Sequence, residues 1–160
     1  MTESLRLQYW NFSPDAVQAL REVNVVLERS GLDPVLVDLV RLRASQINGC
    51  VYCIDMHTRD ALAAGETEER IDALAGWRTS PRFDAREKAA LAWAESLTRL
   101  AETHAPAEDY AVARAQFTDK ELSDLTFVIA VINAWNRVAV GFRQPAVHPD
   151  RANKQAKETT

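Results

Sequence analysis

Both cysteines of the chain and one of its three histidines lie within a single stretch, Cys50-Val51-Tyr52-Cys53-Ile54-Asp55-Met56-His57. If this stretch is helical, the spacings of three and four residues put both thiols and the imidazole above one another on one helix face. A thiolate is a nucleophile, and an imidazole takes up and releases a proton near neutral pH. The stretch is therefore the first candidate for a reactive site.

Other interpretations of a Cys-x-x-Cys pair fit these residues less well. A c-type haem site needs a histidine directly after the second cysteine, where this chain has Ile54. A structural zinc site needs four ligands; the stretch supplies three, and the chain has no second cysteine pair. A lone cysteine would be an ordinary core residue, but two cysteines at this spacing from His57 argue against that. We therefore expect no metal and no cofactor.

The remaining interpretation is a redox-active dithiol. Cysteines at i and i+3 in a first helical turn can close a disulfide with modest adjustment. His57 lies one turn from Cys53 but about 10 Å of helix rise from Cys50, which makes it a base for Cys53. The helix N-terminus instead favours a thiolate at Cys50. We give the base contact more weight, because it also supplies a proton acceptor.

This arrangement predicts a reaction with peroxides. The Cys53 thiolate attacks the O–O bond and becomes a sulfenic acid. Cys50 then condenses with it to form the Cys50–Cys53 disulfide. An external thiol reduces that disulfide by exchange.

The elements that position this stretch are expected to be helices. Only five glycines and six prolines occur in the 160 residues, and the many strong helix formers indicate an all-α protein. Helix starts are marked by N-cap residues, by prolines and by two capping boxes, at Ser13-Pro14, Asp33-Pro34, Thr67, Asp84 and Thr118. The expected helices cover residues 14–29, 34–47, 50–64, 67–76, 84–101, 106–116 and 122–140, with a loop at 77–83.

The chain reads as one domain of residues 1–145, followed by a polar tail of residues 146–160. Residues 1–12 are expected to form a strand-free arm that packs its aromatic residues against the core or a neighbouring subunit. The helix expected at 122–140 is apolar on nearly every side, which is typical of a helix buried on several sides or lying at a subunit interface.

Composition and charge exclude several classes of function. A net charge of −4 argues against a dedicated surface for nucleic acid or anionic membrane. No run of about 18 apolar residues predicts a membrane span, and no signal peptide is evident. Two cysteines so close together do not build a secreted disulfide scaffold. We therefore expect a cytoplasmic protein.

The run from Leu42 to His57, Leu-Arg-Ala-Ser-Gln-Ile-Asn-Gly-Cys-Val-Tyr-Cys-Ile-Asp-Met-His, resembles the core motif of the alkylhydroperoxidase AhpD-like, carboxymuconolactone decarboxylase superfamily. The resemblance implies an AhpD-like fold of six to eight helices and assembly into a homotrimer or homohexamer. It also implies peroxidase activity in which Cys53 attacks, Cys50 resolves and His57 relays protons. Asp38 stands where the family has a glutamate that orients this relay, and Tyr52 stands where full peroxidase motifs have a histidine.

The leading hypothesis is a thiol-dependent alkyl hydroperoxide reductase, with Cys53, Cys50, His57 and Asp38 as catalytic residues and a thiol or dithiol protein as reductant. One alternative is a family member that carries out lactone or decarboxylation chemistry without redox cysteines. Another is a non-catalytic, redox-sensing oligomer.

Overall fold

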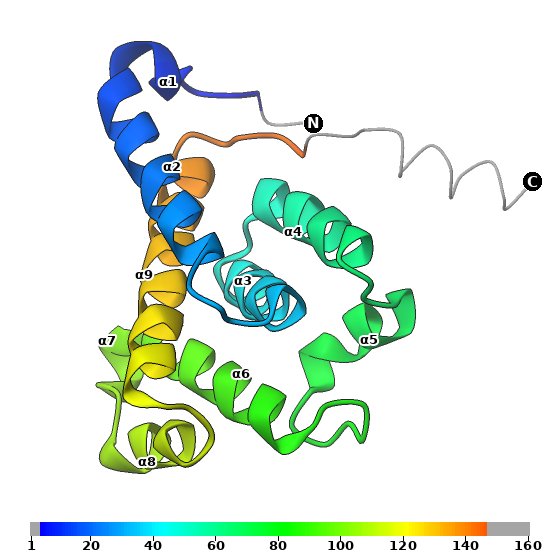
Figure 1. Cartoon of the computed structure of the whole chain (residues 1–160). Coiled ribbons are helices and arrows are strands. Elements are labelled where there is room, and N and C mark those ends of the chain that lie inside the picture. The colour runs from blue at the N-terminus through cyan, green and yellow to red at the C-terminus, as the bar shows by residue number, and fades with distance from the viewer. Residues whose placement is uncertain (1–3, 147–160) are drawn as a thin grey trace, which may run out of the picture.

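The structure, a computed structural model, describes residues 4–146, and within this range the secondary structure is helical with no strand. Apart from its first residue, the tail expected at 146–160 lies outside the described residues. The described helices, labelled in Figure 1, are α1 (Tyr9–Phe12), α2 (Pro14–Glu28), α3 (Pro34–Asn48), α4 (Val51–Ala63), α5 (Glu68–Ala73), the 3₁₀ helix η1 (Leu74–Gly76), α6 (Ala85–Thr98), α7 (Leu100–Thr103), α8 (Ala107–Gln116) and α9 (Asp119–Gly141).

The all-α fold class is confirmed, and the seven longer helices begin within three residues of the expected starts. Asp33 caps α3 by accepting from the Val35 backbone N–H, and both predicted capping boxes form, at Asp84 and at Thr118. The Thr118 box lets α9 begin at Asp119 rather than at Leu122. Ser13 occupies the N-cap position of α2, but its side chain makes no capping hydrogen bond.

Two short helices, α1 and α7, were not among the expected elements. The arm at residues 1–12 contains the short helix α1. The helix expected to reach residue 101 ends at Thr98, and α7 follows as a separate turn. The Thr103 hydroxyl donates to the Ser96 carbonyl at 2.7 Å, so a side chain satisfies an acceptor near the end of α6.

Helix α3 lies in the middle of the molecule and packs against α4, α6 and α9 (Figure 1). Its side chains Leu39, Val40 and Leu42 are completely buried. Burial on several sides removes a large apolar area from water, which stabilises the position of α3. Since α4 follows α3 directly, the position of α3 also fixes where the Cys-x-x-Cys stretch begins.

A charged cluster ties α3 to α6. The buried Glu95 carboxylate accepts from Arg43 at 2.8 Å, from the Trp77 indole at 2.9 Å and from Arg78 at 2.8 Å. Burial alone would raise the pKa of Glu95, but these three donors outweigh it and hold the pKa below its ordinary value. Glu95 is therefore an anion, and it links α6 to α3 and to the segment that follows η1.

The N-terminal segment runs beside the end of α9. The Arg6 backbone N–H donates to the Phe142 carbonyl at 2.9 Å, and the Arg6 guanidinium donates to the Gly141 carbonyl at 3.1 Å. The Tyr9 ring stacks on Phe142 with centroids 5.4 Å apart. The start and the end of the described chain thus form one wall of the molecule.

Helix α9 is buried along much of its length but not all round. Its buried residues include Leu125, Val128 and Ile129, whereas Phe127 is 58% exposed. None of the described helices has the length and apolar character needed to cross a membrane.

Candidate redox site

The turn between α3 and α4 sets the position of the first cysteine. Gly49 ends α3 in the left-handed conformation, with φ of 65°, which costs little for a residue without a side chain. The Cys50 backbone N–H donates to the Ser45 carbonyl at 3.0 Å. Cys50 is then the N-cap of α4, and its sulfur accepts from the Cys53 backbone N–H at 3.3 Å. The expected helix start is therefore found within one residue.

Four polar side chains hold the end of α3 against α9. The Asn48 amide donates to Asn133 at 3.0 Å and to Asn136 at 2.9 Å. Asn136, which is 1% exposed, donates in turn to the Ser45 hydroxyl at 3.0 Å. Buried amides satisfied in this way fix one arrangement of the two helices, since any other arrangement leaves polar groups unpaired. Nothing in the sequence spacing pointed to this network.

Cys50 and Cys53 are joined by a disulfide, with their Cα atoms 5.3 Å apart. This separation lies within the usual range for disulfides. Each cysteine is only 1% exposed. The two sulfurs therefore lie together, as their spacing in the sequence predicts, and the pair is in its oxidised state.

Cys53 and His57 line the same cavity, of about 230 Å³. Its walls come from α1, α2, α3, α4 and α9, and they combine aromatic, aliphatic and polar side chains: Tyr9, Arg21, Asn24, Arg41, Tyr52, Met56, Ile132, Trp135 and Ala139. A small molecule in this cavity could reach both Cys53 and the imidazole. Cys50 does not line it.

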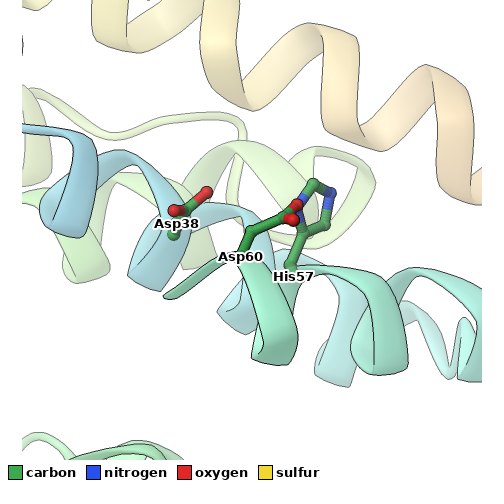
Figure 2. A group of neighbouring side chains, drawn as sticks. All are labelled: Asp38, His57 and Asp60. Atoms are coloured by element: carbon green, nitrogen blue, oxygen red, sulfur yellow. The ribbon is translucent and has the colours of Figure 1, made fainter. Parts of the chain in front are cut away.

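His57 is buried, and its nearest charged neighbour is a residue that the sequence reasoning did not select. The Nδ1 atom of His57 lies 3.4 Å from an oxygen of Asp60, and Figure 2 shows the Asp60 carboxylate beside the ring. Nδ1 has no well-formed hydrogen bond, so the contact is mainly electrostatic. The i, i+3 spacing of His57 and Asp60 on one helix was the signal that could have found it.

Asp38 reaches the same group from α3 (Figure 2). It is 7% exposed and forms an ion pair with Arg41 at 3.6 Å. The polar atoms of Asp38, His57 and Asp60 lie within 4.8 Å of one another. The structure therefore places the predicted orienting carboxylate near the histidine, together with a second carboxylate.

The pKa values of the two carboxylates are shifted in opposite directions. Burial raises the pKa of Asp38 above its ordinary value, although Arg41 and His57 act against this shift. The contact with His57 is the main cause that lowers the pKa of Asp60. Two neighbouring acids whose pKa values are pushed apart can hold and pass on a proton.

These three side chains also offer three ligand atoms for a cation. Arg41, however, already pairs with the Asp38 carboxylate, and its positive charge opposes a metal ion at this place. The group suits proton transfer better than metal binding, and the absence of a metal from the site stays a prediction.

The fold and this site together define a class: an all-helical protein with a Cys-x-x-Cys disulfide at a helix start and a histidine one turn further on. The model of the carboxymuconolactone decarboxylase family matches residues 14–96, which include both cysteines, His57 and the two carboxylates beside it. The chain belongs to this family and has the AhpD-like fold.

The chain is also similar to other proteins in sequence and in structure. The uncharacterised protein YdfG of Bacillus subtilis (strain 168) is 34% identical over 137 residues, which are 86% of this chain and 93% of YdfG. A protein of unknown function from Agrobacterium tumefaciens, described as a candidate antioxidant defence protein AhpD, has a structure that matches with a TM-score of 0.87 at 39% identity, covering 91% of this chain and 99% of that one. The apo debrominase Bmp8 matches with a TM-score of 0.79 at 19% identity, covering 89% of this chain and 76% of its own, which shows a shared fold alone.

Proposed function

We propose that this protein is a thiol-dependent hydroperoxide reductase. The observation that carries the proposal is the disulfide between Cys50 and Cys53, with Cys53 and His57 lining one cavity. A sulfur that can cycle between thiolate and disulfide, next to a proton acceptor and a space for a small substrate, is what peroxide reduction requires.

The reaction begins with the reduced dithiol. His57 takes the proton of Cys53, and the Cys53 thiolate attacks one oxygen of the hydroperoxide. The O–O bond breaks, Cys53 becomes a sulfenic acid, and the alkoxide that leaves receives the proton from His57. The Cys50 thiol then attacks the Cys53 sulfur, which forms the disulfide and releases water. Each turnover reduces one hydroperoxide and oxidises the two cysteines by two electrons.

The two carboxylates support the histidine in different ways. Asp60 remains an anion and stabilises the imidazolium that forms when His57 takes the proton of Cys53. Asp38, with its raised pKa, is the better proton carrier of the two. In this scheme Asp38 and Asp60 are positioning and relay residues, and Cys53, Cys50 and His57 react directly.

The proposal is tested by mass spectrometry of the reduced protein before and after one equivalent of cumene hydroperoxide. The expected product has lost two hydrogens and contains a peptide with Cys50 linked to Cys53. The Cys53→Ser variant is expected to consume no peroxide, and Cys50→Ser to stop at one sulfenic acid that dimedone traps. Wild-type peroxide consumption by Cys53→Ser would refute the proposal.

Two other functions are separated by equally simple tests. An enzyme with lactone or decarboxylation chemistry, as the family description suggests, would keep its activity after both thiols are alkylated. A redox-sensing oligomer would be oxidised once and would show no multiple turnover with any reductant. The disulfide in the structure favours the peroxidase over the first of these, because that chemistry has no use for it.

A further inference from the structure

The two cysteines of the disulfide line two different cavities. Cys53 lines the cavity that contains His57, whereas Cys50 lines a second cavity of about 480 Å³. Cys53 and His57 are absent from the walls of this second cavity, and Cys50 from those of the first. The two partners of the disulfide can therefore be approached from two separate spaces.

Basic side chains line the second cavity. Two arginines line it, Arg6 and Arg143, and no carboxylate is among its described lining residues. The Arg6 guanidinium is held in place by its bond to the Gly141 carbonyl, and Arg6 forms no ion pair with any described residue. A guanidinium in this setting attracts carboxylates and can bind them through two parallel hydrogen bonds.

We propose that the second cavity is the entrance for the reductant, and that the reductant is a small thiol carrying a carboxylate. This inference rests on the proposed function, since it assigns the partner of the reductive half of the same cycle. The volume is in the range of small-molecule sites, which favours a compact thiol over a folded protein domain as the occupant.

The chemistry of exchange favours attack on Cys50. A thiolate that attacks the Cys50 sulfur forms a mixed disulfide with Cys50 and expels Cys53 as a thiolate. The expelled sulfur then lies in the cavity of His57, which can supply a proton or stabilise the charge. A second thiolate attacks the mixed disulfide and releases Cys50. In total two thiols are oxidised to one external disulfide, and the protein disulfide takes up two electrons and two protons.

Attack on Cys53 would be less favourable. It would need the reductant to enter the cavity that the peroxide uses, because Cys53 lines that cavity and not the second one. With two cavities, the peroxide reaches Cys53 from one side and the reductant reaches Cys50 from the other. The two molecules then do not compete for the same cavity.

The first experiment measures only the reductive half-reaction. The oxidised protein is mixed with 3-mercaptopropionate or with 2-mercaptoethanol, and the rate with each thiol is divided by the rate of that thiol with a small uncharged disulfide. We expect the anionic thiol to be preferred by about fivefold at low salt, since two charges at contact distance in water interact by about 1 kcal/mol. The preference should shrink as salt is added.

Variants of one arginine in each cavity identify the entrance. Arg6→Gln should lose the preference, and Arg6→Lys, which keeps the charge, should retain most of it. Arg21 lines the cavity of His57, so Arg21→Gln should retain the preference as well. Loss of the preference in Arg21→Gln but not in Arg6→Gln would overturn the proposal, as would the absence of any preference in the wild type.

The attacked sulfur is identified independently of peroxide chemistry. The reaction with 3-mercaptopropionate is stopped by acid, free thiols are alkylated, and the peptide is fragmented. The mixed disulfide is expected on Cys50 and the alkyl group on Cys53; the reverse pattern would overturn the proposal. Because no peroxide is present, failure here is distinct from failure of peroxide consumption.

Discussion

At the scale of single residues, His57 has two carboxylates near it, and they differ in burial and in the helix that carries them. Asp60 is half exposed and shares a helix with His57, whereas Asp38 is buried and comes from the neighbouring helix. The sequence pattern directs attention to Asp38, because its distance from Cys50 matches a family motif. The contact measured to Nδ1, however, belongs to Asp60.

The first prediction concerns Asp60 as a positioning residue. Asp60→Asn removes the negative charge beside Nδ1, so the imidazolium formed during thiol deprotonation loses its stabilisation. We expect Cys53 oxidation to slow by about tenfold, a part of the ~10²–10⁴-fold that a positioned base contributes. Stopped-flow measurement of peroxide-dependent oxidation, as a profile over pH, checks this. Asp72→Asn, on the exposed face of α5, is the control; an equal loss of rate in both variants would contradict the role of Asp60.

The second prediction follows from the raised pKa of Asp38. A carboxyl with a raised pKa binds its proton more tightly in the native state than in the unfolded chain. Its contribution to stability is therefore present at low pH and is lost as the pH rises from the unfolded value of about 3.9 through the native pKa. The amide side chain of the Asp38→Asn variant cannot titrate. The free energy of unfolding of this variant, relative to that of the wild type, should therefore increase as the pH rises through this range. Urea unfolding at several pH values measures the difference, and a difference independent of pH would contradict the prediction.

At the scale of elements, the turn between α3 and α4 determines where the reactive stretch begins. Gly49 and Gly76 both have open space where a β-carbon would be added, but only Gly49 has a positive φ, of 65°. Since an added β-carbon would meet no clash at either position, comparing the two substitutions isolates the cost of the left-handed backbone at Gly49.

Gly49→Ala is expected to lower the free energy of unfolding by about 1–2 kcal/mol, the cost of a left-handed residue with a side chain. Gly76→Ala should be neutral or stabilising by a few tenths to about 1 kcal/mol, because it restricts the unfolded chain. Denaturant unfolding of both variants under the same conditions provides the measurement. Equal effects in the two variants would mean that the conformation of Gly49 is not what holds the turn.

The charged cluster around Glu95 permits a prediction about the contact of α3 with α6. Glu95→Gln leaves Arg43 largely buried without its anion, and breaking a buried pair in this way costs about 3 kcal/mol. Glu69→Gln removes an exposed partner of Arg82 and should cost less than about 1 kcal/mol. The two unfolding free energies are compared by urea titration; costs of similar size would show that burial of Glu95 does not matter.

At the scale of the whole molecule, helix starts were predictable because caps and prolines act locally, as Asp33, Asp84 and Thr118 illustrate. The meeting of Cys50 and Cys53 was also predictable, since it lies within one helical turn. The end of α6 at Thr98, with α7 following as a separate turn, was not predictable, and neither was the network of Asn48, Asn133 and Asn136. They depend on contacts between segments far apart in the chain, which spacing within one helix does not report.

The assembly of the protein is a prediction that rests on the resemblance and on exposed apolar side chains. Val26 is 69% exposed and Phe127 is 58% exposed, and such residues favour contact with another subunit when they are grouped. Light scattering is expected to give three or six times the chain mass of 17.9 kDa. Phe127→Glu should lower the measured mass if α9 contributes to the contact. A wild-type mass equal to one chain would contradict the assembly.

The pairing of the N-terminal segment with the end of α9 has a consequence for how such proteins diversify. Arg6 belongs to the wall of one cavity and Tyr9 to the wall of the other, yet neither is in α3 or α4, which carry the reactive groups. Substitutions at Arg6 or Tyr9 would thus change the wall of one cavity or the other without changing the residues of α3 and α4. If the protein works as proposed, such changes near the N-terminus would alter which peroxide or thiol is preferred more than they alter the reaction of the sulfurs.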